Sequence, residues 1–385
     1  MENFSYQNPV KILFGKGQIA SIAGEIPAGA KILVTYGSGS IKKNGVYEQV
    51  KAALEGRQWI EFGGIEANPR YETCMKAADL AREEAVDFLL AVGGGSVLDG
   101  TKFLAVAACY KKGDPWNIVA RGATPDAALP IGCVLTLPAT GSEMNCFSVI
   151  TREATKEKLP FSCPLVYPQF SVLDPEITFS LPPRQVSNGI VDAFVHTLEQ
   201  YMTYPVNSPL QDRMAEAIFS TLIEEGPKTL ANPTDYASRA NLVWCATMAL
   251  NGMIAVGVPQ DWATHMIGHE LTVLYGIDHA QTLAIIAPSL LKVQSDAKGE
   301  KLLQFAGRVW GIREGTPESR VEQAIGKMRA FFESVGVPTR LSAYGVAAEA
   351  AATVAERLEK RGWVALGERQ DVTPALVKRI LTLAA

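Results

Sequence analysis

The first half of the chain alternates short apolar runs with stretches of helical spacing, and this pattern restricts its fold most strongly. The apolar runs are residues 30–36 (AKILVTY), 59–62, 87–92 (DFLLAV) and 131–136. Segments rich in helix formers, such as residues 71–85, separate them. Strands that alternate with helices predict a parallel sheet with crossover helices.

The pattern changes at Leu181-Pro182-Pro183, after which it is helical almost throughout. We therefore expect an α/β domain with a Rossmann-like parallel sheet over residues 1–181 and an all-helical domain over residues 182–385. The cleft between two such domains is the expected place for an active site. The helical stretches are 186–202, 208–226, 235–256, 260–274, 280–295, 300–311, 317–335, 347–361 and 373–383.

Small and hydroxyl residues follow three of the predicted strands, as GSGS (37–40), GGGS (93–96) and TLPATGS (136–142). Ligands of parallel sheets bind beyond the carboxyl ends of the strands. The GGGS turn is the strongest signal, because glycines permit positive φ and close approach, and the helix that follows offers free N–H groups to an anion. Asp99 is expected in the first turn of that helix, where the dipole favours it. The turn matches neither GxGxxG nor a Walker A loop, and a plain tight turn is the alternative.

Residues 35–43 (TYGSGSIKK) contain no acid and two lysines, Lys42 and Lys43. An NAD site often keeps an acid near the adenosine ribose, so this stretch would tolerate the 2′-phosphate of NADP. The alternative is that both lysines are simply solvated. Residues 148–173 are expected to be a β-rich excursion, from which Lys158 either reaches back toward the cofactor or remains a solvated turn lysine.

All four histidines of the chain fall between Asp192 and His279. Asp192 and His196 are four residues apart, as are His265 and His269, so each pair shares one face of a helix. A carboxylate with three imidazoles suits a divalent first-row metal. A single histidine on an apolar helix is usually a core residue, but four histidines in one span favour a metal site. The HExxH protease motif is absent.

Composition excludes several classes of protein. A net charge of −4 without a basic stripe argues against broad nucleic-acid binding. The N-terminus lacks the pattern of a signal peptide, and the longest weakly polar run, residues 244–259, is too short for a membrane helix. Six cysteines without a CxxC spacing are expected to be buried thiols of a reducing compartment. These features predict a cytoplasmic enzyme with no nucleic-acid or membrane partner.

The chain resembles the iron-containing (group III) alcohol dehydrogenases, most closely their NADPH-dependent aldehyde reductase and butanol dehydrogenase-like branch. The resemblance covers essentially the whole chain and rests on four motifs. These are GGGSVLDGTK (93–102), TLPATGSEMN (136–145), LPPRQVSNGIVDAFVHTLEQY (181–201) and GVPQDWATHMIGHELTVLYGIDHAQTLA (257–284). The resemblance implies a dehydroquinate synthase-like architecture and a homodimer.

The resemblance also implies roles for individual residues. Metal ligands would be Asp192, His196, His265 and His279, with Fe²⁺ or Zn²⁺ as the ion, and His269 would lie in the active site as a candidate for proton relay or as a structural histidine. Gly37, Ser38 and Ser40, with Gly39 between them, would accept the 2′-phosphate of NADP(H), with NAD(H) also possible. The remaining cofactor contacts would be Asn68, Gly93, Gly94, Gly95, Ser96, Asp99, Thr136, Thr140, Asn145 and Lys158.

These features lead to the hypothesis that the chain transfers a hydride between NADP(H) and an aldehyde or primary alcohol, with the metal polarising the substrate oxygen. The alternatives are a polyol dehydrogenase or a dehydroquinate synthase-like lyase of the same superfamily, a metal-dependent hydrolase, and a non-catalytic nucleotide-binding protein. The neutral and basic 35–43 stretch and the three-histidine set disfavour the first two. The glycine-rich strand ends argue against a hydrolase, and the histidine cluster argues against a protein without catalysis.

Overall fold

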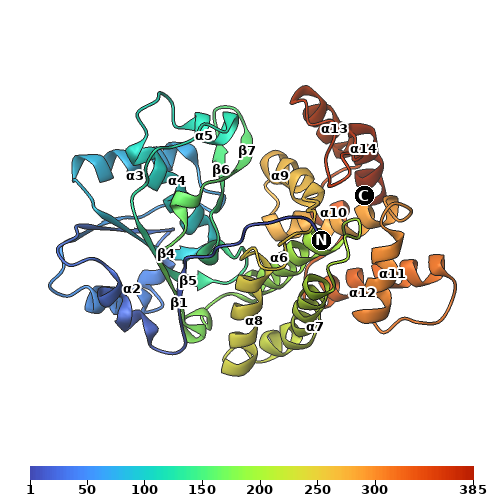
Figure 1. Cartoon of the computed structure of the whole chain (residues 1–385), viewed down its shortest axis with the longest axis horizontal. Coiled ribbons are helices and arrows are strands. Elements are labelled where there is room, and N and C mark those ends of the chain that lie inside the picture. Colours follow the sequence, from blue (N-terminus) through green and yellow to red (C-terminus); the bar gives the residue numbers. More distant parts are fainter. The chain divides into compact units, whose positions relative to one another are not determined.

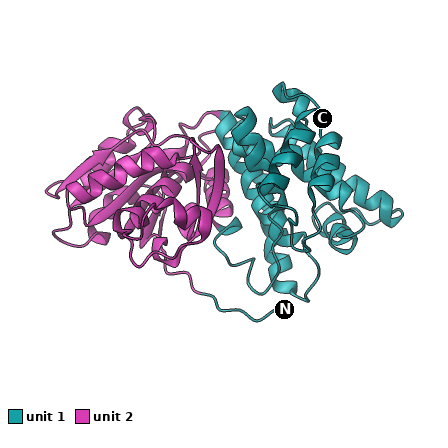
Figure 2. Cartoon of the chain, turned by 90° about the horizontal axis from the view of Figure 1, so that it is seen from above, with its two compact units in different colours: residues 1–6, 183–232, 248–385 teal, residues 7–182, 233–247 magenta.

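The computed structural model describes all residues, 1–385, and the chain divides into two compact units (Figures 1 and 2). Unit 1 comprises residues 1–6, 183–232 and 248–385, and unit 2 comprises residues 7–182 and 233–247. A single boundary near residue 181 therefore does not describe the division fully. The first six residues join the helical unit, and the helix that follows Asn232 joins the α/β unit, because each packs against the unit far from it in sequence.

Unit 2 is built on a six-stranded sheet in the order β1-β8-β5-β4-β2-β3, in which every neighbouring pair is parallel. The chain runs from β2 outward to β3 and then returns to the other side of β2 as β4. The boundary between β2 and β4 is therefore a topological switch point, where parallel sheets bind ligands. The strands are β1 (Lys11–Phe14), β2 (Ile32–Tyr36), β3 (Trp59–Phe62), β4 (Phe88–Gly94), β5 (Ile131–Leu137) and β8 (Phe170–Leu173).

The two faces of the sheet carry alternate residues of each strand. On β4, Phe88, Leu90 and Val92 belong to one buried apolar cluster and Ala91 to another. The first cluster includes residues of α1 (Ile22–Glu25) and α2 (Val46–Ala53), and the second includes residues of α4 (Gly95–Cys109) and α8 (Tyr236–Ala249). Both faces are covered, which explains why the predicted strands are continuous apolar runs. Unit 2 also contains α3 (Tyr71–Glu83) and α5 (Trp116–Arg121).

The sequence patterns located four of the six strands but not β1 and β8. β1 is a short, half-exposed edge strand, and β8 was predicted only as part of the β-rich stretch of residues 148–173. The β-rich excursion consists of an antiparallel hairpin, β6 (Phe147–Arg152) with β7 (Glu157–Ser162), followed by β8. The charged turn at residues 153–156 joins the two hairpin strands.

Unit 1 is helical, and most of its helices agree with the predicted segments to within a few residues. Two predictions are corrected: the helix predicted at 208–226 continues to Ala231, and the one predicted at 235–256 ends at Ala249 and belongs mostly to unit 2. Its central helix, α6, is buried on all sides from Val186 to Tyr201. Phe194 of α6 packs on Phe219 and Phe332, with ring centroids 4.6 and 5.3 Å apart. The helices are α6 (Pro183–Tyr201), α7 (Pro209–Ala231), α9 (Ala263–Tyr275), α10 (His279–Val293), α11 (Gly299–Arg308), α12 (Pro317–Ser334), α13 (Ala350–Lys360) and α14 (Pro374–Leu383).

No helix in the structure combines the length and apolarity that crossing a lipid bilayer demands. All six cysteines are free thiols, and all but Cys109 are buried. The prediction of buried thiols without a disulfide framework is confirmed for the other five.

Candidate metal centre and nucleotide site

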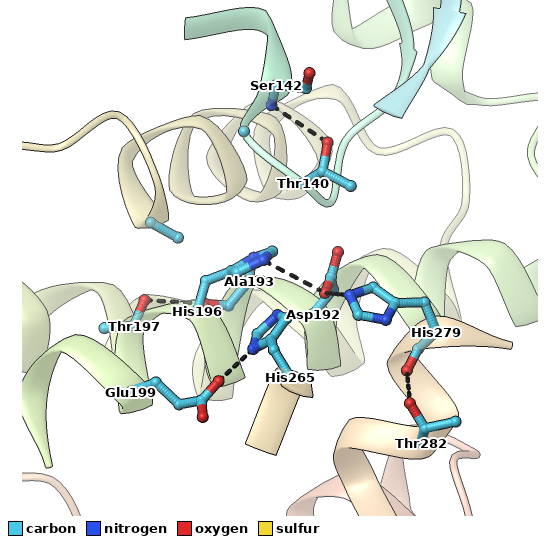
Figure 3. A network of polar contacts seen from close by, with 12 residues as sticks. Thr140, Ser142, Asp192, Ala193, His196, Thr197, Glu199, His265, His279 and Thr282 are labelled. Carbon is cyan, nitrogen blue, oxygen red and sulfur yellow. Dashed lines mark hydrogen bonds and ion pairs between the residues drawn. The ribbon is translucent and has the colours of Figure 1, made fainter. Parts of the chain in front are cut away.

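The candidate metal ligands come from three helices of unit 1. Asp192 and His196 lie one turn apart on the buried helix α6, where they are 3% and 4% exposed. His265 lies in the first turn of α9, and His279 is the first residue of α10. Figure 3 shows the four side chains directed toward one another. A fully buried helix rarely carries ionisable residues without partners, so their convergence demands a physical explanation.

The distances among these side chains suit a shared cation. Asp192 Oδ1 lies 3.8 Å from His196 Nε2 and 3.7 Å from His279 Nε2. The ligand atoms of Asp192, His265 and His279 all lie within 4.8 Å of one another. The rings of His196 and His265 stack at 4.7 Å. Ligand atoms at about 2.1 Å from one tetrahedral ion would be about 3.4 Å apart.

Asp192 supplies the test of whether a metal fits. Its Oδ1 atom is buried and accepts no hydrogen bond, and the distances of 3.7 and 3.8 Å to two imidazole nitrogens exceed hydrogen-bond length. A buried carboxylate oxygen without a hydrogen bond is costly unless something else satisfies it. One carboxylate and three imidazoles form a ligand set for Zn²⁺ or Fe²⁺, so the residues present fit a divalent metal.

His269 lies on α9 one turn beyond His265 and is 3% exposed. Its ring centroid is 5.5 Å from that of His279 and 6.5 Å from that of His265. The structure places His269 beside the cluster, and neither His269 nor His196 belongs to the set of ligand atoms that all lie within 4.8 Å of one another. His196 differs in that its Nε2 lies 3.8 Å from Asp192 Oδ1.

Glu199 is a residue of this region that the sequence patterns did not single out. It lies on α6 three residues after His196, is 2% exposed, and its carboxylate contacts His265 Nδ1. Burial raises the pKa of Glu199 well above its usual value, with the nearby Asp261 as the next cause. The signal in the sequence was its position on the same helical face as Asp192 and His196, but spacing alone does not show which residue it contacts.

In unit 2, the predicted nucleotide contacts gather at one edge of the sheet. Residues 37–40 follow β2, residues 93–96 join β4 to α4, and Thr136 ends β5. These three strands are neighbours and parallel, so their carboxyl ends meet at the switch point. The β4–β5 register shifts at Gly93/Gly94, which leaves Thr136 as the extra residue of a bulge. Bulges of this kind commonly re-aim side chains at binding sites.

The glycines of the 93–95 turn serve close approach, not positive φ as the sequence argument assumed, since none of them has a positive φ. A Cβ at Gly94 would lie 2.9 Å from Leu137 Cβ, and one at Gly95 would overlap the side chain of Thr140. Gly39, by contrast, has a φ of +93°. The helix α4 begins at Gly95, within the turn itself. Its first N–H groups are thus brought to the strand ends, as an anion site requires.

Asp99 does not lie in the first turn of its helix, contrary to expectation, because α4 begins two residues earlier than predicted. Its carboxylate instead accepts hydrogen bonds from Ser142 Oγ at 2.7 Å and from the Val149 N–H at 2.9 Å. Burial raises the pKa of Asp99. These two hydrogen bonds hold the loop that carries Ser142 against α4.

Lys102, which the sequence patterns also did not single out, completes this network. It is 1% exposed and donates to Ser142 Oγ, Asn145 Oδ1 and the Phe147 carbonyl at 2.8, 2.9 and 2.9 Å. Burial lowers the pKa of Lys102 to about 8. Asn145, a predicted cofactor contact, is thus buried and held by Lys102, and its own amide donates to the Gly141 carbonyl at 2.8 Å.

Lys158 lies on β7 and is 4% exposed, so it is neither in the charged turn nor solvated. It donates to Asn68 Oδ1 at 2.8 Å, and the Asn68 N–H donates to Ser96 Oγ at 3.2 Å. These three predicted contacts are therefore brought together beside the glycine turn. Lys42 and Lys43 are exposed, and Lys42 donates to Glu61 of β3 at 2.9 Å, which places an acid closer to the 35–43 stretch than the sequence indicated.

Comparisons with known proteins show the family to which the chain belongs. Residues 9–175 match the iron-containing alcohol dehydrogenase family, and residues 186–373 match the C-terminal region of the Fe-containing alcohol dehydrogenase family. The chain belongs to this family. It is therefore an NAD(P)-dependent oxidoreductase of the alcohol dehydrogenase and aldehyde reductase class.

Two curated relatives and two solved structures illustrate the similarity. The chain is 55% identical to the NADPH-dependent aldehyde reductase YqhD of Escherichia coli, over 100% of both chains. It is 43% identical to the probable NADH-dependent butanol dehydrogenase 1 of Bacillus subtilis, over 94% of this chain and 95% of that one. The structure matches substrate- and cofactor-free YqhD with a TM-score of 0.94 at 54% identity, over 100% of both chains. It matches butanol dehydrogenase A of Thermotoga maritima with a TM-score of 0.96 at 38% identity, over 100% of this chain and 99% of that one.

Proposed function

We propose that the chain reduces aldehydes to primary alcohols, and catalyses the reverse reaction, with NADP(H) and a divalent metal held by Asp192, His196, His265 and His279. The observation that carries this proposal is the buried carboxylate oxygen of Asp192, which accepts no hydrogen bond and faces two imidazole nitrogens at 3.7 and 3.8 Å. When bound, the metal would polarise the substrate oxygen as a Lewis acid, and the nicotinamide would carry the hydride.

The residues around the ligands define what this chain contributes. Asp192 supplies one negative charge against a divalent ion and leaves a net positive site, which favours an electron-rich substrate oxygen. His269, buried beside His279, is our candidate for moving the proton between the substrate oxygen and solvent. The ligand set accommodates both Fe²⁺ and Zn²⁺.

The preference for NADP(H) is supported by the turn after β2. Gly37, Ser38, Gly39 and Ser40 carry no acid that would repel a 2′-phosphate, and the positive φ of Gly39 shapes the turn. The E. coli relative at 55% identity is described as NADPH-dependent, and the B. subtilis relative at 43% identity as NADH-dependent. NAD(H) is accordingly the second cofactor to assay. The remaining contacts we propose are Asn68, Gly93, Gly94, Gly95, Ser96, Asp99, Thr136, Thr140, Asn145 and Lys158.

A direct assay tests this proposal. Metal-loaded protein is mixed with NADPH and butanal, and loss of the reduced-nicotinamide absorbance is followed, with NADH and chelator-treated protein in parallel. We expect consumption of NADPH faster than of NADH, and loss of activity after chelation that Zn²⁺ or Fe²⁺ restores. Hydrolysis of an ester or phosphate without oxidation of NADPH by any aldehyde would instead favour a metal-dependent hydrolase.

We further propose a cytoplasmic location and a homodimeric state. The free thiols, five of them buried, support a reducing compartment. The dimer follows from the family resemblance, and light scattering on the purified protein tests it.

A further inference from the structure

Glu199 extends the row of candidate ligands along one face of α6. Asp192, His196 and Glu199 occupy positions i, i+4 and i+7, which share a helical face. Glu199 is 2% exposed, and Figure 3 shows its carboxylate directed at His265 of α9. One helix therefore presents two candidate ligands and a third acidic group that reaches a ligand on another helix.

Both oxygens of the Glu199 carboxylate are engaged by α9. Oε1 accepts the backbone N–H of Thr264 at 2.5 Å, and Oε2 contacts His265 Nδ1. In its ionised form Glu199 can only accept, so Nδ1 then carries the ring proton and Nε2 keeps its lone pair. A metal-ligating histidine needs that tautomer, and a carboxylate on the opposite nitrogen also makes the imidazole a stronger ligand.

The same carboxylate fixes the start of α9. Thr264 is the second residue of this helix, where a backbone N–H has no partner within the helix and a negative charge is favourable. The Glu199 carbonyl accepts the N–H of Asp261 at 2.9 Å, and the Asp261 carboxylate pairs with the buried Lys298 at 2.8 Å. The residue between Asp261 and α9, Trp262, has a φ of +61°, which is uncommon for a bulky side chain.

We propose that Glu199 is a positioning residue of the metal centre, which sets the tautomer and orientation of His265 and holds the first turn of α9 in register with the ligands of α6. This inference rests on the proposed function, because it presupposes that His265 binds a metal. The alternative is that Glu199 only caps α9, in which case its loss would lower stability without changing metal affinity.

The test is the affinity of the full-length protein for Zn²⁺, measured by competition with a chromogenic chelator. Glu199→Gln keeps the size of the side chain but removes the charge and one of the two accepting oxygens. We expect its Zn²⁺ affinity to fall about 10- to 100-fold. We also expect kcat to fall while the KM for NADPH stays unchanged, since the nucleotide turns belong to unit 2.

Glu216→Gln is the matched control. Glu216 is also a buried carboxylate of unit 1, is 8% exposed, and accepts from the hydroxyl of Tyr201 at 3.0 Å without contacting a histidine. Its variant should bind Zn²⁺ as the wild type does. The Co²⁺-loaded forms add a spectroscopic readout, because a reoriented His265 changes the visible absorption of Co²⁺ whereas a lost helix cap alone does not.

A double-mutant cycle separates action through His265 from a general loss of fold. In the His265→Ala background, Glu199→Gln should have no further effect on Zn²⁺ affinity. The positioning role alone would be overturned if wild type and Glu199→Gln bound Zn²⁺ with equal affinity. It would also be overturned if Glu199→Gln lowered the Zn²⁺ affinity by the same factor in the presence and in the absence of His265. Absence of Zn²⁺ binding by the wild type would overturn the proposed function together with it. If Glu199→Gln does not fold, Glu199→Asp, which withdraws the carboxylate by one methylene, takes its place with the same expectations.

Discussion

The polar residues of the two units are used in different ways. In unit 1, Asp192, His265 and His279 converge and His196 lies beside Asp192, whose buried oxygen accepts no hydrogen bond from the protein. In unit 2, the buried polar residues of the strand-end loops bind one another, as Lys102 does with Ser142 and Asn145. The arrangement in unit 1 leaves the Asp192 oxygen available to a metal ion. The arrangement in unit 2 stabilises the loops that follow the strands.

This difference indicates which part of each unit determines ligand binding, the side chains in unit 1 and the backbone in unit 2. Side-chain chemistry defines the candidate metal centre, so changing one residue type should remove it. Backbone shape defines the proposed nucleotide turns, where Gly94 and Gly95 allow β4, β5 and the following loop to approach closely. Adding a methyl group to Gly94 or Gly95 should therefore weaken NADPH binding more than removing a polar side chain from the surface of the same turns.

The largest effect is expected from His265→Ala, which removes one imidazole of the metal centre. The purified variant should contain little metal, because the three remaining ligands would bind the ion more weakly, and turnover should fall by about a thousandfold or more, because Lewis-acid stabilisation of the transition state amounts to several kcal/mol. Metal analysis by mass spectrometry and the NADPH–butanal assay provide the two measurements. NADPH binding, followed by fluorescence, should persist because the nucleotide turns lie in unit 2. Full metal occupancy in this variant would exclude His265 from the ligand set.

The next effect is expected from Gly95→Ala, whose new Cβ would overlap Thr140. The turn must shift to relieve the overlap, so NADPH affinity should fall about tenfold or more, equivalent to the 1–3 kcal/mol typical of overpacking. Zn²⁺ content should be unchanged. Gly24→Ala is the control in the same unit, because its Cβ would meet nothing within 4 Å and its φ is not positive. Equal NADPH affinities for Gly95→Ala and the control would refute the close-approach explanation.

A smaller effect concerns the pH dependence of stability. Burial lowers the pKa of Lys102 from its ordinary 10.5 to about 8. Between these two values the unfolded chain holds a proton that the folded chain has lost, so the contribution of Lys102 to the free energy of unfolding rises with pH. The slope approaches about 1.4 kcal/mol per pH unit and vanishes below the folded pKa.

Lys102→Met removes this titration and isolates its contribution. The free energy of unfolding of the wild type minus that of the variant, measured by urea unfolding from pH 7 to 10, should be constant up to about pH 8 and then increase. The constant part reflects the lost hydrogen bonds to Ser142, Asn145 and Phe147. A difference that stays flat or declines above pH 8 would show that Lys102 keeps its charge in the folded state.

Much of the fold could be predicted from the sequence because its signals are local. The buried strands β2, β4 and β5 are continuous apolar runs, and the helices of unit 1 repeat with clear spacing. β1 was missed because it is a short, half-exposed edge strand, and β8 was foreseen only as part of the β-rich stretch of residues 148–173. The exchange of residues 1–6 and 233–247 between units is a property of tertiary packing, to which local patterns are insensitive.

The same limit explains what was missed at the sites. The i, i+4 spacing of Asp192 and His196 reflects helix geometry, so their shared face could be foreseen. The contact of Glu199 with His265 joins residues 66 positions apart, and that of Lys102 with Ser142 joins residues 40 apart. Glycines at 93–95 were correctly taken to mark a special turn, but the reason, crowding by Leu137 and Thr140, depends on strands that meet only in the fold.

The coordination of the metal itself provides the most direct measurement. X-ray absorption at the metal edge of the Zn²⁺-loaded protein should show a first shell of nitrogen and oxygen at about 2.0–2.2 Å, with the scattering pattern of three imidazoles. Asp192→Asn should weaken metal binding, and each histidine variant should remove one imidazole contribution. A first shell containing sulfur, or one without imidazole scattering, would contradict the assignment of Asp192, His196, His265 and His279.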